Sequence, residues 1–135
     1  MRRFTAGLVL LAALFATGRC ADKLPEQDRR ITQATPVAKL PVEFLWSDYQ
    51  ADRRAADRKY WGKAVDVSGK VTGVGADAPR RVLFDVAPPH GVEARLLDDQ
   101  ATAILAAAAV GERLTLRCFC AGLDGNVVLT SCIRP

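Results

Sequence analysis

Residues 49–74 read YQADRRAADRKYWGKAVDVSGKVTGV, and two different periodicities meet inside this segment. Up to Gly62 the apolar residues recur three or four positions apart, which is the spacing of one helix face. Beyond Gly62, apolar residues occupy alternate positions, at Val65, Val67 and Val71, and the residues between them are mostly polar. This alternation is typical of a strand with one buried face. We therefore predict a helix that leads directly into a long first strand.

The helix is predicted to begin at Pro41, whose missing N–H costs nothing in a first helical turn. The residues of its apolar stripe are Val42, Leu45, Trp46, Tyr49, Ala56 and Tyr60. Asp52 and Arg53 fall where the stripe should continue. Either a polar contact fixes the helix there or the stripe narrows for one turn, and we slightly favour the narrowing.

Alternation continues on the C-terminal side of the junction. The predicted strands are residues 63–75, 81–86, 92–97, 114–120 and 127–133, and a helix is predicted over 100–110. Gly69 falls on the apolar face of the first strand, where a missing side chain permits a bend or bulge. Asp124-Gly125-Asn126 predicts a hairpin between the last two strands.

The predicted order is helix, three strands, helix and two strands, which is the order of the OB-fold with an extra N-terminal helix. We therefore expect a mainly β protein of the α+β class, built as a five-stranded Greek-key barrel with a helix between strands three and four. The helix that contains Trp46 should cover one end of the barrel, and the 100–110 helix the other.

The first 18 residues have the pattern of a secretory signal peptide. Arg2 and Arg3 are positive, residues 6–16 are apolar, and small residues precede a cut before Arg19. Residues 19–40 show no sustained period, so we expect a flexible linker before an OB-fold domain at 41–135. The protein is expected to be exported, to the periplasm or beyond the cell.

Cys20 follows the apolar run, at the place where bacterial lipoproteins are cleaved and lipidated. Arg19 immediately before it breaks the lipoprotein pattern. Simple secretion is therefore favoured, and a lipid on Cys20 that anchors the protein to the membrane is the alternative.

The charge balance gives no indication of a nucleic-acid partner. The chain has 19 Lys and Arg and 15 Asp and Glu, and removing Arg2 and Arg3 leaves 17 against 15. OB barrels bind ligands on strands two and three, and the outward residues there form a candidate binding face: Arg81, Leu83, Asp85 and Arg95. This face offers no aromatic ring for base stacking, so nucleic acid is disfavoured.

The sequence shows no converging acid, base and nucleophile, and its only histidine is His90, in a Pro-Pro turn. We predict that the protein is not an enzyme and needs no cofactor or metal. The favoured function is an envelope module that binds an unidentified protein or glycan. The alternatives are a binder of single-stranded nucleic acid or oligosaccharide and, less favoured, a thiol-redox or metal site at the cysteines.

A family resemblance rests on several short motifs. They are Tyr49-x-Ala51-Asp52, Ala55-Ala56-Asp57-x-Lys59-Tyr60-x-Gly62-Lys63, Val67-x-Gly69-x-Val71, Gly111-Glu112-x-Leu114-Thr115-Leu116-Arg117-Cys118-Phe119-Cys120-x-Gly122 and Val127-Val128-Leu129-x-x-Cys132. From about Val42 to Ile133 the chain resembles the bacterial envelope proteins called tRNA_anti-like, which include OB-fold lipoproteins. The resemblance implies an OB-fold and an envelope location, and it implies no activity. The chain departs from it at Asp52, where Asn is usual, in the additional Cys118 and in Arg19.

The four cysteines of a chain predicted to be exported suggest disulfides. Cys118 and Cys120 share one face of the fourth predicted strand, and Cys132 lies across the hairpin. If the numbers of paired residues add up to 252, Cys120 lies opposite Cys132. If they add up to 250, Cys118 lies there instead. The spacing in the resembling family favours Cys120–Cys132, with Cys118 free or paired with Cys20.

Overall fold

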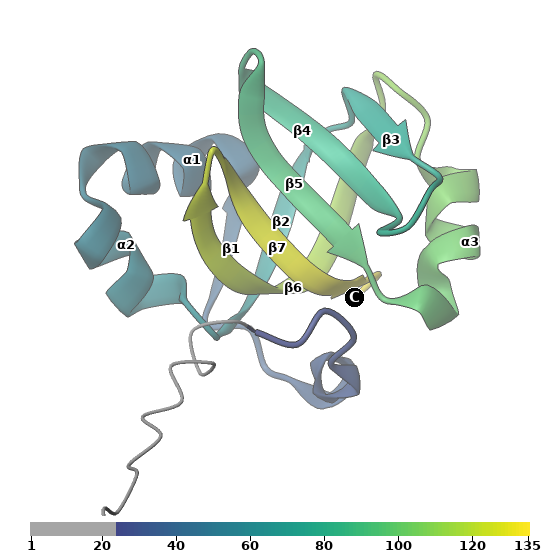
Figure 1. Ribbon diagram of the computed structural model, residues 1–135, viewed down its shortest axis with the longest axis horizontal. Coiled ribbons are helices and arrows are strands. Elements are labelled where there is room, and N and C mark those ends of the chain that lie inside the picture. Colours follow the sequence, from purple (N-terminus) through teal and green to yellow (C-terminus); the bar gives the residue numbers. More distant parts are fainter. Residues whose placement is uncertain (1–23) are drawn as a thin grey trace, which may run out of the picture.

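The computed structural model describes residues 24–135, in which the strands form one curled sheet and the helices lie at its ends (Figure 1). The elements are η2 (Arg29–Gln33), β1 (Ala38–Pro41), α1 (Val42–Ala51), α2 (Arg53–Tyr60), β2 (Ala64–Lys70), β3 (Gly73–Gly75), β4 (Arg81–Ala87), β5 (His90–Leu96), α3 (Asp98–Ala107), β6 (Arg113–Asp124) and β7 (Asn126–Ile133). The described chain is thus mainly β, with three α-helices and one seven-stranded sheet.

The predicted N-terminal helix is two helices that meet at Asp52. The backbone of Asp52 is extended, with φ −160° and ψ 102°, so α1 ends there and α2 starts in a new direction. The Asp52 carboxylate accepts a hydrogen bond from the Ala55 N–H at 3.1 Å and caps α2. The interruption of the apolar stripe is therefore a polar capping contact, and our preference for a narrowed stripe is wrong.

The predicted first strand is also divided, into β2 and β3, with Val71 and Thr72 between them. The Val71 N–H donates to Glu112 O, just before β6, and the Thr72 N–H donates to Leu83 O on β4. The first strand therefore pairs with both halves of the sheet, as the OB-fold order implies.

Gly69 allows the close approach of α1 to β2. A Cβ atom at this position would lie 2.5 Å from Val42 Cγ2 and 3.0 Å from Phe84 Cδ1. The glycine is therefore required by packing, whereas the sequence indicated only a bend or bulge.

The strand order in the sheet is β1-β2-β6-β7-β5-β4-β3. The closed five-stranded barrel of the prediction is thus not confirmed in detail. Two strands are additional, because the first predicted strand is split and because β1 pairs in parallel with β2 at the edge.

The helices occupy opposite ends of the sheet (Figure 1). Helix α1 contacts β1, β2, β4, β5 and β7, and α2 contacts β6. The main core lies between these two helices and the sheet. Its largest side chains include Tyr49, Phe84 and Leu116, and Trp46 packs against it. Helix α3 contacts β4 and β7 at the other end.

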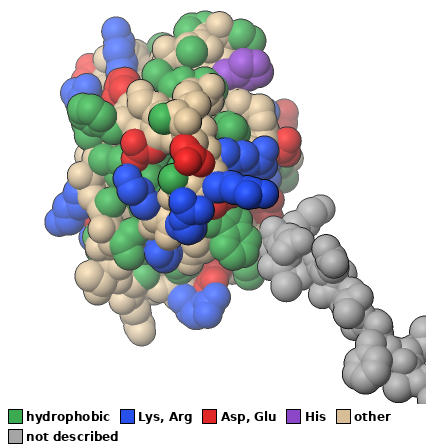
Figure 2. Space-filling view, turned by 90° about the vertical axis from the view of Figure 1, so that its left-hand side faces the viewer, with side chains coloured by type: hydrophobic (Ala, Val, Ile, Leu, Met, Phe, Trp, Pro, Cys, Tyr) green, Lys and Arg blue, Asp and Glu red, His purple; other side chains and the backbone are tan. Residues whose placement is uncertain are grey.

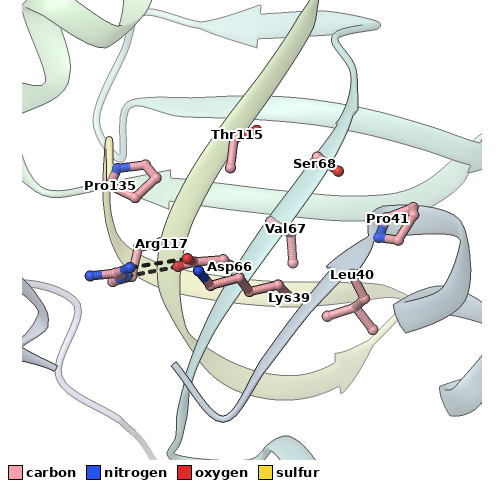
Figure 3. A pocket seen from close by; sticks show the side chains of 9 residues that line it. All are labelled: Lys39, Leu40, Pro41, Asp66, Val67, Ser68, Thr115, Arg117 and Pro135. Carbon is pink, nitrogen blue, oxygen red and sulfur yellow. Dashed lines mark hydrogen bonds and ion pairs between the residues drawn. The ribbon is translucent and has the colours of Figure 1, made fainter. Parts of the chain in front are cut away.

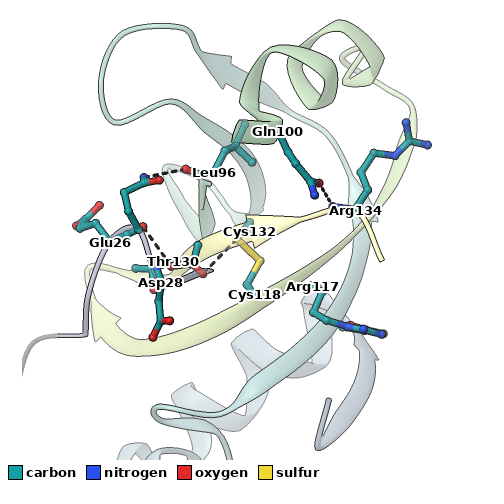
Figure 4. Close-up of a disulfide and its surroundings, with 12 residues drawn as sticks. Glu26, Asp28, Leu96, Gln100, Arg117, Cys118, Thr130, Cys132 and Arg134 are labelled. Carbon is teal, nitrogen blue, oxygen red and sulfur yellow. Dashed lines mark hydrogen bonds and ion pairs between the residues drawn. A yellow bond between two sulfur atoms is a disulfide. The ribbon is translucent and has the colours of Figure 1, made fainter. Parts of the chain in front are cut away.

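Residues 24–37, here called the N-terminal strap, cross the curled sheet beside β7 (Figure 4). Ile31 is 0% exposed and packs with Ala64, Leu97 and Ile133. The Asp28 N–H donates to the Ser131 hydroxyl at 2.7 Å. These contacts join the strap to a strand about one hundred residues later in the chain.

A second set of contacts joins the strap to α3. Gln27 donates to Leu96 O at 3.2 Å, and its amide oxygen accepts from the Asp98 N–H at 2.9 Å, at the start of α3. In place of the predicted flexible linker, residues 24–40 thus belong to the folded unit, which begins before residue 41. The predicted signal peptide at 1–18 and the possible lipidation site at Cys20 lie outside the described residues.

Candidate functional site

The residues of the predicted binding face lie on the outer side of β4 and β5. Arg81 lies opposite Arg95 and Leu83 lies opposite Glu93, so these four side chains are neighbours. Asp85, opposite Gly91, lies further along the same strand. The structure therefore brings Arg81, Leu83 and Arg95 together and places Asp85 at one end of the face.

Carboxylates neutralise the cations of this face. Arg81 Nε lies 3.7 Å and Arg95 Nε 3.4 Å from Glu93 Oε1, and Arg95 Nη1 lies 2.6 Å from Glu26 Oε1. Burial alone would lower the pKa of Arg95, but the hydrogen bond to Glu26 and the charge of Glu93 outweigh it and raise that pKa. The face is polar and internally paired, which gives it little attraction for a polyanion.

A small hollow of about 250 Å³ adjoins this face beneath the strap. Arg95, Glu26, Asp124 and Val128 contribute to its lining, together with Thr130. Thr130 is 2% exposed, and its hydroxyl has no hydrogen-bond partner among the described residues. An unpartnered buried hydroxyl is a cost to folding that a bound polar atom could relieve.

A larger hollow of about 410 Å³ lies on the outer face of β1, β2 and β6 (Figure 3), here called the β2–β6 hollow. Its lining residues are Lys39, Leu40, Pro41, Asp66, Val67, Ser68, Thr115, Arg117 and Pro135. Three strands supply it: β1 from the segment predicted to be a linker, and β2 and β6 through the register that pairs Ser68 with Thr115.

Arg117 and Asp66 form a bidentate ion pair at one side of this hollow. Arg117 Nε donates to Asp66 Oδ1 at 2.7 Å and Nη2 donates to Oδ2 at 3.0 Å, while Nη1 lies 3.4 Å from Ala34 O. The hydrogen bonds that Arg117 donates to Asp66 raise the pKa of Arg117, and Asp66 is only 6% exposed. The guanidinium is thus held in one orientation by two elements, with part of its edge toward solvent.

Lys39 is the second cation of the β2–β6 hollow. It is exposed, and it forms no ion pair within residues 24–135. The alternation along β2 and β6 is enough to place Asp66, Ser68 and Arg117 on the outward face of these strands. It could not show that they form a hollow, because β1 has no strand signal of its own.

The disulfide joins Cys118 to Cys132 (Figure 4), and Cys120 is free and buried. The predicted Cys120–Cys132 pairing is therefore not the one formed. Near the turn, Leu123 pairs with Val127, in the register whose numbers add up to 250. The register shifts along the hairpin at bulges, and Ser131 has a positive φ of 55°. Beyond this residue the 250 register returns and brings Cys118 to Cys132.

Cys120 instead faces the helices. Its sulfur lies 3.4 Å from the Tyr49 hydroxyl, which donates to Asp57 at 2.9 Å. Burial raises the pKa of the Cys120 thiol, although the hydrogen bond with Tyr49 acts in the opposite direction. A buried, protonated thiol is a poor nucleophile, so this cysteine is a packing residue.

Within residues 24–135, no group of three or more His, Cys, Asp and Glu side chains is placed to hold a metal ion. In the same part of the chain, no helix has the length and apolar character needed to cross a membrane.

The family model described as tRNA_anti-like matches residues 2–133. The chain belongs to the tRNA_anti-like family. This family is related to the OB-fold, which agrees with the resemblance identified from the motifs.

In this tRNA_anti-like chain, several motif residues meet where α2 joins β6. Besides the Tyr49–Asp57 hydrogen bond, the Gly62 N–H donates to Cys120 O at 2.8 Å. Gly122 has a φ of +88°, and a Cβ there would lie 3.3 Å from Asp57 Oδ1. These motif residues therefore attach the helices to the sheet.

No protein with a curated description matches the chain significantly. Among solved structures, the chain is similar to a Klebsiella pneumoniae subsp. pneumoniae MGH 78578 protein named a "putative nucleic acid-binding lipoprotein". The identity is 14%, the TM-score is 0.49, and the match covers 80% of this chain and 94% of that one. A likeness of this size carries no argument about what the tRNA_anti-like chain described here binds.

Proposed function

We propose that this tRNA_anti-like chain is a non-catalytic binding module of the cell envelope that takes a glycan or protein partner in the β2–β6 hollow. The observation that carries the proposal is the composition of that hollow. It combines one unpaired cation, Lys39, and the guanidinium of Arg117, which is paired with Asp66, with the hydroxyls of Ser68 and Thr115 and with apolar side chains from β1.

This composition suits a partner that carries both hydroxyl and acidic groups. Ser68 and Thr115 lie opposite each other across β2 and β6 and can exchange hydrogen bonds with hydroxyls. Arg117 is already oriented by Asp66 and Ala34, so binding an anion would cost little additional side-chain entropy. An acidic oligosaccharide or an acidic protein segment meets these requirements.

Binding without catalysis agrees with the state of Asp66, the acidic side chain that lines the hollow. Asp66 accepts two hydrogen bonds from Arg117, so it is not free to remove a proton from Ser68 or Thr115. An envelope location is supported by the N-terminal pattern of positive and apolar residues and by the disulfide, which suits an oxidising compartment.

The glycan arm of the proposal is tested by titrating the protein with oligogalacturonate and with its neutral methyl ester. We expect binding of the acidic form only, weakened about fivefold by Lys39→Gln, since a charge-assisted contact contributes on the order of 1 kcal/mol. Arg81→Gln is the matched control, because it removes one cation from the β4–β5 face. Equal effects of the two substitutions would argue against the hollow.

The protein arm uses pull-downs from envelope extract with the wild type and the same two variants. A partner retained by the wild type and by Arg81→Gln, but lost with Lys39→Gln, supports the proposal. A single-stranded oligonucleotide is added to both assays. Tight binding of it that falls steeply with salt would support nucleic-acid binding in place of our proposal.

A further inference from the structure

We propose that the outward side of α2 and the residues after it form a second interaction surface, which docks on the anionic headgroups of a phospholipid bilayer. The α2 surface consists of Arg54, Arg58, Lys59, Trp61 and Lys63. It lies apart from the β2–β6 hollow, so it does not depend on the function proposed for that hollow.

The first observation is uncompensated positive charge. Arg54, Arg58 and Lys59 are exposed on α2, and none of them forms an ion pair within residues 24–135. Lys63 adds a fourth cation at the C-terminal end of the helix, where its Nζ donates to Arg58 O at 2.9 Å. Figure 2, which faces the side of the molecule that carries α1 and α2, shows several Lys and Arg side chains there, with Asp and Glu side chains among them.

The carboxylates of α1 and α2 near these cations accept hydrogen bonds from groups of the two helices. Asp48 accepts from the Tyr60 hydroxyl at 2.5 Å, Asp57 accepts from Tyr49, and Asp52 caps the start of α2. They therefore hold the two helices together and leave the outward cations for an external anion.

The second observation is an exposed tryptophan beside these cations. Trp61 directly follows α2 and is 37% exposed, one of the few large apolar side chains at the surface of the described chain. Its ring lies against Gly122 on β6, close enough for a Cβ there to be 3.3 Å from Trp61 Cδ1. An amphipathic ring held at the surface among cations suits the headgroup layer of a membrane.

The third observation is where the described chain begins. Leu24 lies beside Gly62, with its Cδ2 atom 3.9 Å from the position that a Gly62 Cβ would take. Four residue steps separate Leu24 from Cys20, a reach of at most about 14 Å. Any attachment to a membrane through that part of the chain would thus hold the α2 surface close to the bilayer.

Two features favour a lipid surface as the partner: the positive charge of the α2 surface, and the position of Leu24, the first described residue, beside that surface. Each cation near an anionic bilayer raises affinity by roughly fivefold. An isolated surface of this kind would bind only weakly, whereas attachment nearby would raise its effective concentration at the bilayer. The orientation that follows leaves the α3 end of the molecule directed away from the membrane.

The experiment measures binding to vesicles by sedimentation. The protein used starts at Arg19 and carries no lipid, and it contains every residue of the described fold. Vesicles of phosphatidylcholine with 30 mol% phosphatidylglycerol should bind it at low salt, with a blue shift in tryptophan emission, and pure phosphatidylcholine vesicles should not. Raising the salt should release the protein.

Variants decide whether the α2 surface is responsible. Replacing Arg54, Arg58 and Lys59 by Gln should weaken vesicle binding about 100-fold, from three losses of about fivefold. The matched control replaces Lys70, Arg113 and Arg134 by Gln. These substitutions remove the same amount of charge, at residues outside the α2 surface. It should retain most of the affinity. Trp61→Phe should remove most of the emission shift, which separates Trp61 from the partly buried Trp46.

Several results would overturn the proposal. They are an absence of binding to the anionic vesicles, an equal loss in both triple variants, or an emission shift that persists in Trp61→Phe. Tighter binding of a single-stranded oligonucleotide than of vesicles, lost in the α2 triple variant, would assign the surface to nucleic acid. Oligogalacturonate binding by the α2 triple variant reports separately on the β2–β6 hollow.

Discussion

Replacement of Ile31 by Ala tests whether the N-terminal strap is part of the folded unit. Ile31 is 0% exposed and fills a site formed by Ala64, Leu97 and Ile133. Truncating a fully buried isoleucine costs about 2–5 kcal/mol, through lost burial and the cavity left behind. Because the site is a satellite of the main core and can partly relax, we expect a loss of about 3 kcal/mol in the free energy of unfolding. For a domain of this size the melting temperature should fall by about 12 °C.

The assay is reversible urea unfolding under oxidising conditions, with thermal melting in parallel. Val37→Ala is the matched control, since it also shortens a β-branched residue of the strap but at a side chain that is 56% exposed. It should cost no more than about 0.5 kcal/mol. If Ile31→Ala costs as little as Val37→Ala, the strap does not contribute to stability, and the prediction of a flexible linker over residues 19–40 would be restored.

Four further predictions follow from single positions. Cys118→Ser should lower the free energy of unfolding by on the order of 3 kcal/mol, because the disulfide closes a loop with a sequence separation of 14, whereas Cys120→Ser should leave the bond intact on non-reducing peptide maps. Gly69→Ala should cost about 1–3 kcal/mol in urea unfolding, since its Cβ has no room, and an unchanged midpoint would contradict the close packing of α1 on β2. Thr130→Val should be neutral or slightly stabilising, and a loss above about 1 kcal/mol would mean that the hydroxyl has a partner. Intact-mass measurement of the exported protein should show Arg19 as its first residue, and a first residue Cys20 that carries diacylglycerol would instead establish lipidation.

After residue 41, the local signals of the sequence were enough to predict the type of each main element and the two faces of the strands. The change of period after Gly62 marks the passage from α2 to β2, and Gly125 lies in the hairpin turn with a φ of +71°. Such features depend on a few neighbouring residues, through helical or strand spacing and turn chemistry. The same signals identified the candidate face on β4 and β5, but they could not show that Glu26 and Glu93 neutralise it.

Pairing over long sequence distances was decided only in three dimensions. The choice of Cys118 as the partner of Cys132 depends on bulges along the hairpin, and strand parity is the same for Cys118 and Cys120. The position of Asp52 as a cap likewise depends on the direction that α2 takes once it contacts β6.

The strap shows the physical reason most directly. The strap is held in place by irregular hydrogen bonds to Ser131 and Leu96. Because such contacts require no regular spacing of residues, its sequence shows neither a helical nor a strand period. Ser131 lies 103 residues and Leu96 lies 69 residues from its partner in the strap, so no short window contains both sides of either contact. The sequence by itself therefore determined where most helices, strands and turns form, but not β1 or the break between α1 and α2. Only the tertiary structure decided which segments complete the sheet and how its hollows are lined.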